Sequence, residues 1–306
     1  MTPKLRRLTA RLAEVAVHRD PPTVEGMVAL TRSILLDDFQ TGGPPPVSPR
    51  LVFLHIMKTA GTSLSELVSG WVPPGRSKVH ASLDEVVMLP RPLLARLQFL
   101  AGHLPFEALS LIPGRFETVT VLRDPVARAI SHYAELVNSR PPYEHLTLDE
   151  FVSSDLYDVP SGNYQARHLA LRIGLADAWV EFSPHQRYLD AGGGLSEANV
   201  LASLFDSTPL FMSDEELLDA ARKNLAAIDH VGTAEDLPAL ARELATIFGA
   251  EFSAVPRLNV SRGFDRSQLS PAVRRRLEER TAVDRELYSL AASRALRSPG
   301  APPAAR

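Results

Sequence analysis

Short apolar runs mark the expected strands of this chain, and helical spacing marks the segments between them. Residues 51–56, LVFLHI, form an apolar run typical of a buried strand. The run at 116–122, FETVTVL, has the β-branched and apolar content of a strand covered on both faces. Between them, the apolar residues of 62–71 recur at i, i+3, i+4 and i+7, which predicts a helix with one face on a sheet.

The same alternation continues along the chain. A further strand ends in LQFLAGH, and short apolar segments at 209–212 and 230–233 are candidate strands. Helical patterns at 214–228 and 235–248 fit the crossovers. We therefore predict an α/β fold, with a P-loop-like parallel β-sheet flanked by helices on both faces.

The organisation around this sheet follows from breaks in the pattern. Residues 1–40 read as N-terminal helices, and 41–50, TGGPPPVSPR, as a turn-rich linker. A single domain is expected over 51–297, with a less regular insertion at 139–200. The tail at 298–306 has a composition typical of disorder.

Composition excludes several classes of protein. The 306 residues carry a net charge of −3 with no basic stripe, so no nucleic-acid partner is expected. Cysteine is absent, which removes disulfides and thiolate zinc sites. No apolar run approaches the roughly 18 residues of a membrane span. These features fit a cytoplasmic protein.

The loop after the first strand has the composition of an anion site. A strand–loop–helix unit offers free backbone N–H groups and a positive helix end. Here Lys58 adds a charge, Gly61 allows close backbone approach, and Thr62 and Ser63 add hydroxyls. The order G-x-x-x-x-G-K-[ST] of a nucleoside triphosphate loop is missing. An ordinary strand-to-helix turn is the alternative interpretation.

A second anion site follows the 116–122 strand. Asp124 and Pro125 form a strong helix start, with Asp124 as the cap, and the helix is expected to run to about Asn138. Arg123 ends the strand and Ser131 lies about two turns into the helix, so both suit a phosphate. Two anion sites at two strand ends suit a nucleoside with phosphate groups at both ends.

These two segments resemble those of a known family. FLHIMKTAGTSL is similar to the 5′-phosphosulfate loop of sulfotransferases that use 3′-phosphoadenosine-5′-phosphosulfate (PAPS), and VLRDPVARAISHY to their 3′-phosphate segment. The resemblance is nearest to carbohydrate sulfotransferases of the heparan sulfate 2-O-sulfotransferase type, in a bacterial-like version without an anchor. Met57 stands where that family usually has proline.

The resemblance implies a sulfotransferase fold and a set of roles. PAPS would be the co-substrate and adenosine 3′,5′-bisphosphate the product, with no metal needed. Lys58 would stabilise charge on the bridging oxygen during transfer, and His103 would be the general base. The donor-binding residues would be Lys58, Thr59, Ala60, Gly61, Thr62, Ser63, Arg123 and Ser131. A structural histidine at a strand end is the alternative for His103.

The acceptor is expected to be a hydroxyl on a sugar, glycolipid or glycosylated metabolite, received by the 139–200 insertion. Its candidate contacts form a polar cluster in NYQARHLA: Asn163, Gln165, Arg167 and His168. A polar helix start explains that cluster equally well. Two other functions remain open, a P-loop kinase using Mg-ATP and a non-catalytic nucleotide-binding module. The oligomeric state is not predicted.

Overall fold

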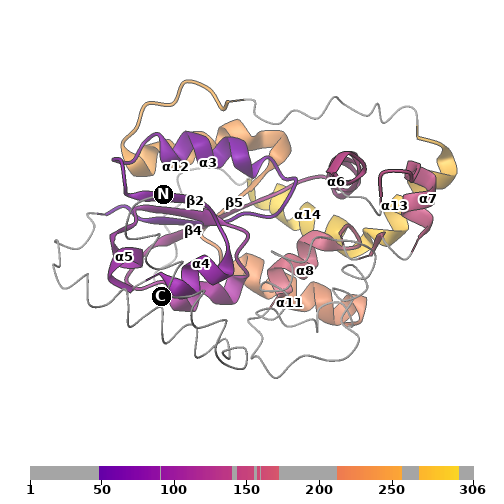
Figure 1. The fold of residues 1–306 in the computed structure, drawn as a ribbon, viewed down its shortest axis with the longest axis horizontal. Helices are drawn as coiled ribbons and strands as arrows, with labels where there is room; N and C mark the ends of the chain where they lie inside the picture. The colour runs from indigo at the N-terminus through magenta and orange to yellow at the C-terminus, as the bar shows by residue number, and fades with distance from the viewer. Residues whose placement is uncertain are drawn as a thin grey trace, which may run out of the picture.

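The computed structural model describes residues 48–89, 91–139, 143–154, 157–158, 160–171, 212–256 and 269–295. The expected N-terminal helices and the tail lie outside these residues, as does the candidate strand at 209–212 apart from Met212, which lies in a bend; the expected insertion lies only partly within them. Figure 1 shows a sheet with helices above and below it.

The sheet has five strands in the order β2-β3-β1-β4-β5, and every neighbouring pair is parallel. The strands are β1 (Leu51–Leu54), β2 (Ser77–Ala81), β3 (Phe99–Gly102), β4 (Glu117–Leu122) and β5 (His230–Thr233). β1 is central, so the chain passes from one side of the sheet to the other beside it. Ligands of such sheets bind at the carboxyl ends of the strands near this crossing point. The predicted α/β class is confirmed.

Two groups of helices cover the two faces of the sheet. The apolar side chains of β1 alternate between them, with Leu51 and Phe53 in one core and Val52 and Leu54 in the other. On the first face lie α3 (Gly61–Ser69) and α12 (Leu237–Phe248). On the second lie α4 (Leu83–Met88), α5 (Arg91–Arg96), the short 3-10 helix η1 (Phe106–Leu111), α8 (Tyr164–Ala170), α11 (Asp214–Ala227) and α14 (Ala282–Ala295).

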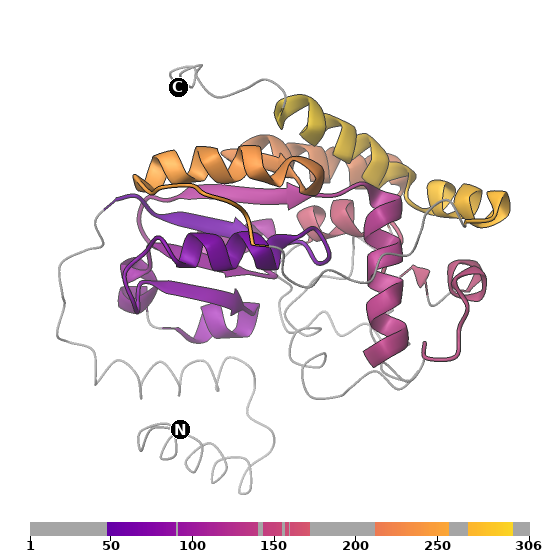
Figure 2. The same cartoon turned by 90° about the horizontal axis from the view of Figure 1, so that it is seen from above.

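A third apolar cluster lies beyond the sheet. It joins α6 (Pro125–Ser139), α7 (Leu148–Ser153) and α13 (Pro271–Arg280). The strand arrows of Figure 2 point toward α6, which lies across their ends. Asp124 caps α6 as predicted, because its Oδ1 accepts from the Ala127 N–H at 2.8 Å. α6 therefore forms one wall at the carboxyl ends of the strands.

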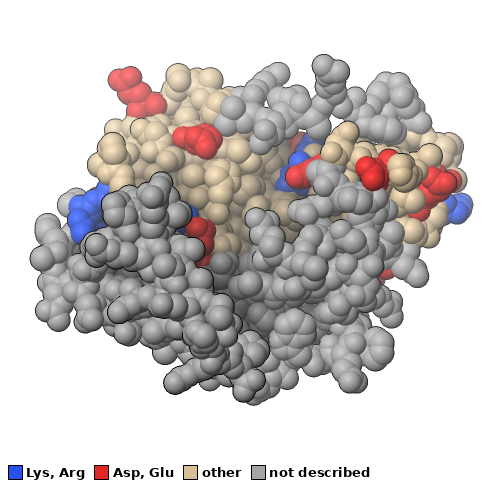
Figure 3. All heavy atoms as spheres, in the orientation of Figure 1, with Lys and Arg blue, Asp and Glu red and all other residues tan. Residues whose placement is uncertain are grey.

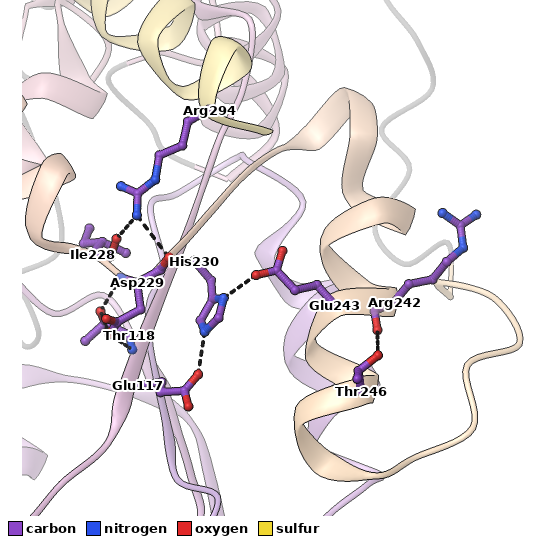
Figure 4. Close-up of polar contacts among 9 residues, drawn as sticks. All are labelled: Glu117, Thr118, Ile228, Asp229, His230, Arg242, Glu243, Thr246 and Arg294. Carbon is purple, nitrogen blue, oxygen red and sulfur yellow. Dashed lines mark hydrogen bonds and ion pairs between the residues drawn. The ribbon is translucent and has the colours of Figure 1, made fainter. Parts of the chain in front are cut away.

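The amino ends of β4 and β5 are tied together by a polar network (Figure 4). The His230 ring bonds Glu243 of α12 through Nδ1 at 2.5 Å and Glu117 of β4 through Nε2 at 2.6 Å. Beside it, Asp229 Oδ2 accepts from both the backbone N–H and the hydroxyl of Thr118. These bonds fix the register of β5 against β4 at the amino ends of the strands, whereas the expected site lies at the carboxyl ends.

Among the helices of the described segments, none has the length and apolar character needed to cross a membrane.

Candidate functional site

The loop from β1 to α3 has a tight left-handed path. Lys58 and Ala60 have φ of 69° and 67°, a conformation uncommon for residues with a side chain. Left-handed residues placed in a short turn direct successive N–H groups into a concave arrangement that suits an anion. The loop leads directly into the first turn of α3, where the N–H groups have no partner within the helix. The backbone here can therefore hold a phosphate or sulfate.

Some side chains of this loop stabilise its conformation and are not available to a ligand. The Thr59 hydroxyl donates to the Ile56 carbonyl at 2.8 Å and is buried. Ser63 is also buried, whereas Thr62 is half-buried and Ala60 is exposed. The contribution of Thr59 to an anion would thus come from its backbone N–H, because its hydroxyl proton is already used.

Gly61 is required by a neighbouring ring. A Cβ at this position would lie 2.0 Å from Cδ2 and 2.2 Å from Nε2 of His55. The His55 ring is buried, and it stacks on Phe53 with centroids 5.3 Å apart. Burial, followed by the nearby histidines and Lys58, holds the pKa of His55 well below the ordinary value, so the ring is neutral. The loop therefore packs against the neutral aromatic ring of His55.

The His103 ring lies beside the His55 ring. The centroids of the His103 and His55 rings are 4.6 Å apart, and His103 Nδ1 is 2.7 Å from the His55 carbonyl oxygen. A carbonyl only accepts, so Nδ1 carries the proton and Nε2 keeps its lone pair. The residue is exposed at the surface, but the protein atoms around its ring reduce its hydration and lower the pKa of His103; His80 also lowers it, and the His55 carbonyl and Glu135 act in the opposite direction. A neutral imidazole with a free Nε2 is the form that a general base needs.

Lys58 is paired with a residue that the sequence analysis did not single out. Its Nζ lies 2.9 Å from Oε2 of Glu135 on α6. Glu135 is four residues beyond Ser131, so the two share one face of α6. That spacing was a usable signal in the sequence, since the helix from Pro125 was predicted.

Arg123 connects the two predicted anion sites. It follows β4 directly, and its Nη1 donates to the Lys58 carbonyl at 3.1 Å. Ser131 is buried on α6, which starts beside Arg123. The structure thus brings the loop after β1 and the segment after β4 into direct contact, as the sheet order requires.

The four candidate acceptor residues lie at α8, and their contacts are largely internal. Asn163 Oδ1 accepts from the N–H groups of Val283 and Asp284, at 3.1 and 3.3 Å. Arg167 donates to the Asp158 carbonyl and is half-buried. His168 is buried, and burial lowers its pKa to about 3.

Gln165, the fourth, is fully buried, and both ends of its amide bond the backbone of Arg123. These contacts place α8 in the scaffold under Arg123, and an acceptor contact by this cluster stays a prediction.

The surface and the carboxylates add two observations. On the face drawn in Figure 3, the basic side chains of the described residues are scattered and form no continuous patch. Among the same residues, no three His, Asp or Glu side chains are arranged to hold a metal ion. Asp124, which follows Arg123 directly in the chain, is engaged as a helix cap.

Comparisons with known proteins leave the function to be argued from this site. No family model matches the chain, and no curated protein matches it in sequence. Among solved structures, a sulfotransferase from Alicyclobacillus acidocaldarius is 16% identical, with a TM-score of 0.41, over 82% of this chain and 100% of that one. A likeness of this size supports neither a shared fold nor a shared activity.

Proposed function

We propose that the protein is a sulfotransferase that moves a sulfuryl group from PAPS to an acceptor hydroxyl on a sugar, glycolipid or glycosylated metabolite. The observation that carries the proposal is the contact between the two anion-binding segments, in which Arg123 Nη1 donates to the Lys58 carbonyl. One ligand with phosphate groups at both ends of a nucleoside would engage both segments together.

The donor would be held from two sides. The N–H groups of the loop and of the first turn of α3 would receive the 5′-phosphosulfate. The Arg123 fork and the Ser131 hydroxyl would receive the 3′-phosphate. Fixing the donor in this way supplies the orientation on which in-line transfer depends.

The chemistry would need one base and one cation. His103 Nε2 would take the proton of the acceptor hydroxyl as its oxygen attacks sulfur. The bond from sulfur to the bridging oxygen would break, and Lys58 would stabilise the charge left on that oxygen. The products would be a sulfate ester and adenosine 3′,5′-bisphosphate. Lys58 would exchange its contact with Glu135 for the donor, which a flexible four-carbon side chain permits.

Calorimetric titration tests the donor site without knowledge of the acceptor. Adenosine 3′,5′-bisphosphate should bind without added metal, and more tightly than ATP with magnesium. A preference for magnesium-ATP would reject the proposal in favour of a kinase. Binding of the bisphosphate, with no sulfate transfer from PAPS to any of a broad panel of sugars and glycolipids, would support a non-catalytic nucleotide-binding module.

A further inference from the structure

Gln165 brackets the residue that would hold the 3′-phosphate. Its Oε1 accepts from the Arg123 N–H at 2.9 Å, and its Nε2 donates to the Arg123 carbonyl at 2.9 Å. The backbone groups fix which end of the amide faces which, because an N–H only donates and a carbonyl only accepts. The Gln165 side chain is fully buried, whereas Arg123 is half-buried, so the two bonds lie where the core meets the surface.

Gln165 is itself held in place by α14. Asp284, buried at the start of α14, accepts from the N–H groups of Gln165 and Ala166 at 3.1 and 2.7 Å. In return, Asn163 accepts from the N–H groups at the start of α14. The starts of α8 and α14 thus cap each other, which leaves Gln165 little freedom to move.

The two hydrogen bonds between Gln165 and the Arg123 backbone orient the Arg123 side chain. Arg123 lies between the end of β4 and the start of α6, where the chain changes direction. Its N–H and its carbonyl both bond the Gln165 amide, and a backbone polar group that loses such a bond away from water is costly to the fold. Satisfying both from one rigid amide fixes the direction in which the Arg123 side chain leaves the backbone.

We propose that Gln165 is a positioning residue for recognition of the 3′-phosphate of the donor, acting through Arg123. This inference rests on the proposed function and assigns Gln165 to the donor side of the site. Gln165 makes no contact with the phosphate itself. It sets the orientation of Arg123, and hence the preference for a nucleotide with a 3′-phosphate over one without.

The test compares two nucleotides that differ only in that phosphate. Adenosine 3′,5′-bisphosphate and adenosine 5′-phosphate are titrated against the wild type, against Gln165→Met and against a control, Asn224→Leu. The control removes another part-buried hydrogen bond from a side-chain amide to α8, from Asn224 Nδ2 to the Leu169 carbonyl at 2.8 Å, without touching Arg123. Folding is checked by circular dichroism and thermal melting.

The ratio of the two affinities decides the outcome. Gln165→Met should reduce the preference for the bisphosphate roughly tenfold and should leave its affinity for adenosine 5′-phosphate unchanged. The control, Asn224→Leu, should keep the wild-type preference. An unchanged ratio, or equal losses for both nucleotides, would overturn the proposal.

If Gln165→Met fails to fold, Gln165→Glu takes its place, because an ionised carboxylate cannot donate to the Arg123 carbonyl. A wild type with no preference for the bisphosphate would instead reject the proposed function itself, before any variant is compared.

Discussion

Replacement of His103 separates its catalytic role from a structural one. His103→Asn keeps a side-chain N–H that can donate to the His55 carbonyl, now 2.7 Å from Nδ1, and removes the ring nitrogen that would take the proton. Loss of a general base should lower kcat/KM by roughly 10² to 10⁴, or about 3–5 kcal/mol in the transition state. Affinity for adenosine 3′,5′-bisphosphate should stay unchanged, because in the proposed site the loop and Arg123, and not His103, would hold the phosphates.

The assay measures initial rates of adenosine 3′,5′-bisphosphate formation from PAPS, with the sugar that accelerates it most in a screening panel. His145→Asn is the matched control, since His145 is exposed in the turn before α7 and is not among the groups that shift the pKa of His103. The wild-type rate should rise with pH through a pKa below the ordinary histidine value, since the base acts when deprotonated and packing lowers the pKa of His103. Normal turnover with weaker nucleotide binding in His103→Asn would refute the role.

Three further predictions concern Arg123, the ion pair of Lys58 and the network of His230. Arg123→Ala should weaken adenosine 3′,5′-bisphosphate binding by at least roughly tenfold by calorimetry, and unchanged affinity would sink the two-segment site. Glu135→Gln should raise PAPS affinity by up to about fivefold, because it frees Lys58 from a partly exposed pair; weaker binding would contradict that competition. Burial lowers the pKa of His230, but its hydrogen bonds to Glu243 and Glu117 outweigh this and raise it, so the stabilisation is complete below the unfolded pKa and is lost as pH rises through the folded one. Thermal melts of His230→Gln should therefore show a larger deficit at about pH 6 than at about pH 9, and equal deficits would exclude the linkage.

The sequence predicted those elements whose local pattern agrees with their burial. β1 and β4 are buried along nearly their whole length, and α6 begins at a cap and a proline, so each carried its own signal. β2, SKVHA, was missed because it is an edge strand with mostly half-buried residues and no apolar run. An edge strand owes its place to pairing with β3, which no local pattern contains.

The candidate site divides in the same way. Lys58, His103 and Arg123 were predicted because each follows an apolar run that forms a strand, and parallel strands end at one edge. The bracket of Gln165 on Arg123 spans 42 residues and depends on where α8 packs, so the sequence showed only a polar helix start. Pairing of Lys58 with Glu135 likewise needs α6 to lie across the strand ends.

Gly61 offers a test of which neighbour demands a glycine in the loop. The sequence suggests close approach of a phosphate, whereas the structure places His55 2.0 Å from a Cβ at this position. Gly61→Ala should therefore displace the loop or the ring, and lower affinity for adenosine 3′,5′-bisphosphate. If the ring is the cause, His55→Ala should restore much of that affinity in the double variant, at a cost in stability from the cavity it leaves. Calorimetry on the two single variants and the double variant gives their coupling directly. A double variant that binds no better than Gly61→Ala would show that the phosphate, and not His55, excludes a side chain from the loop.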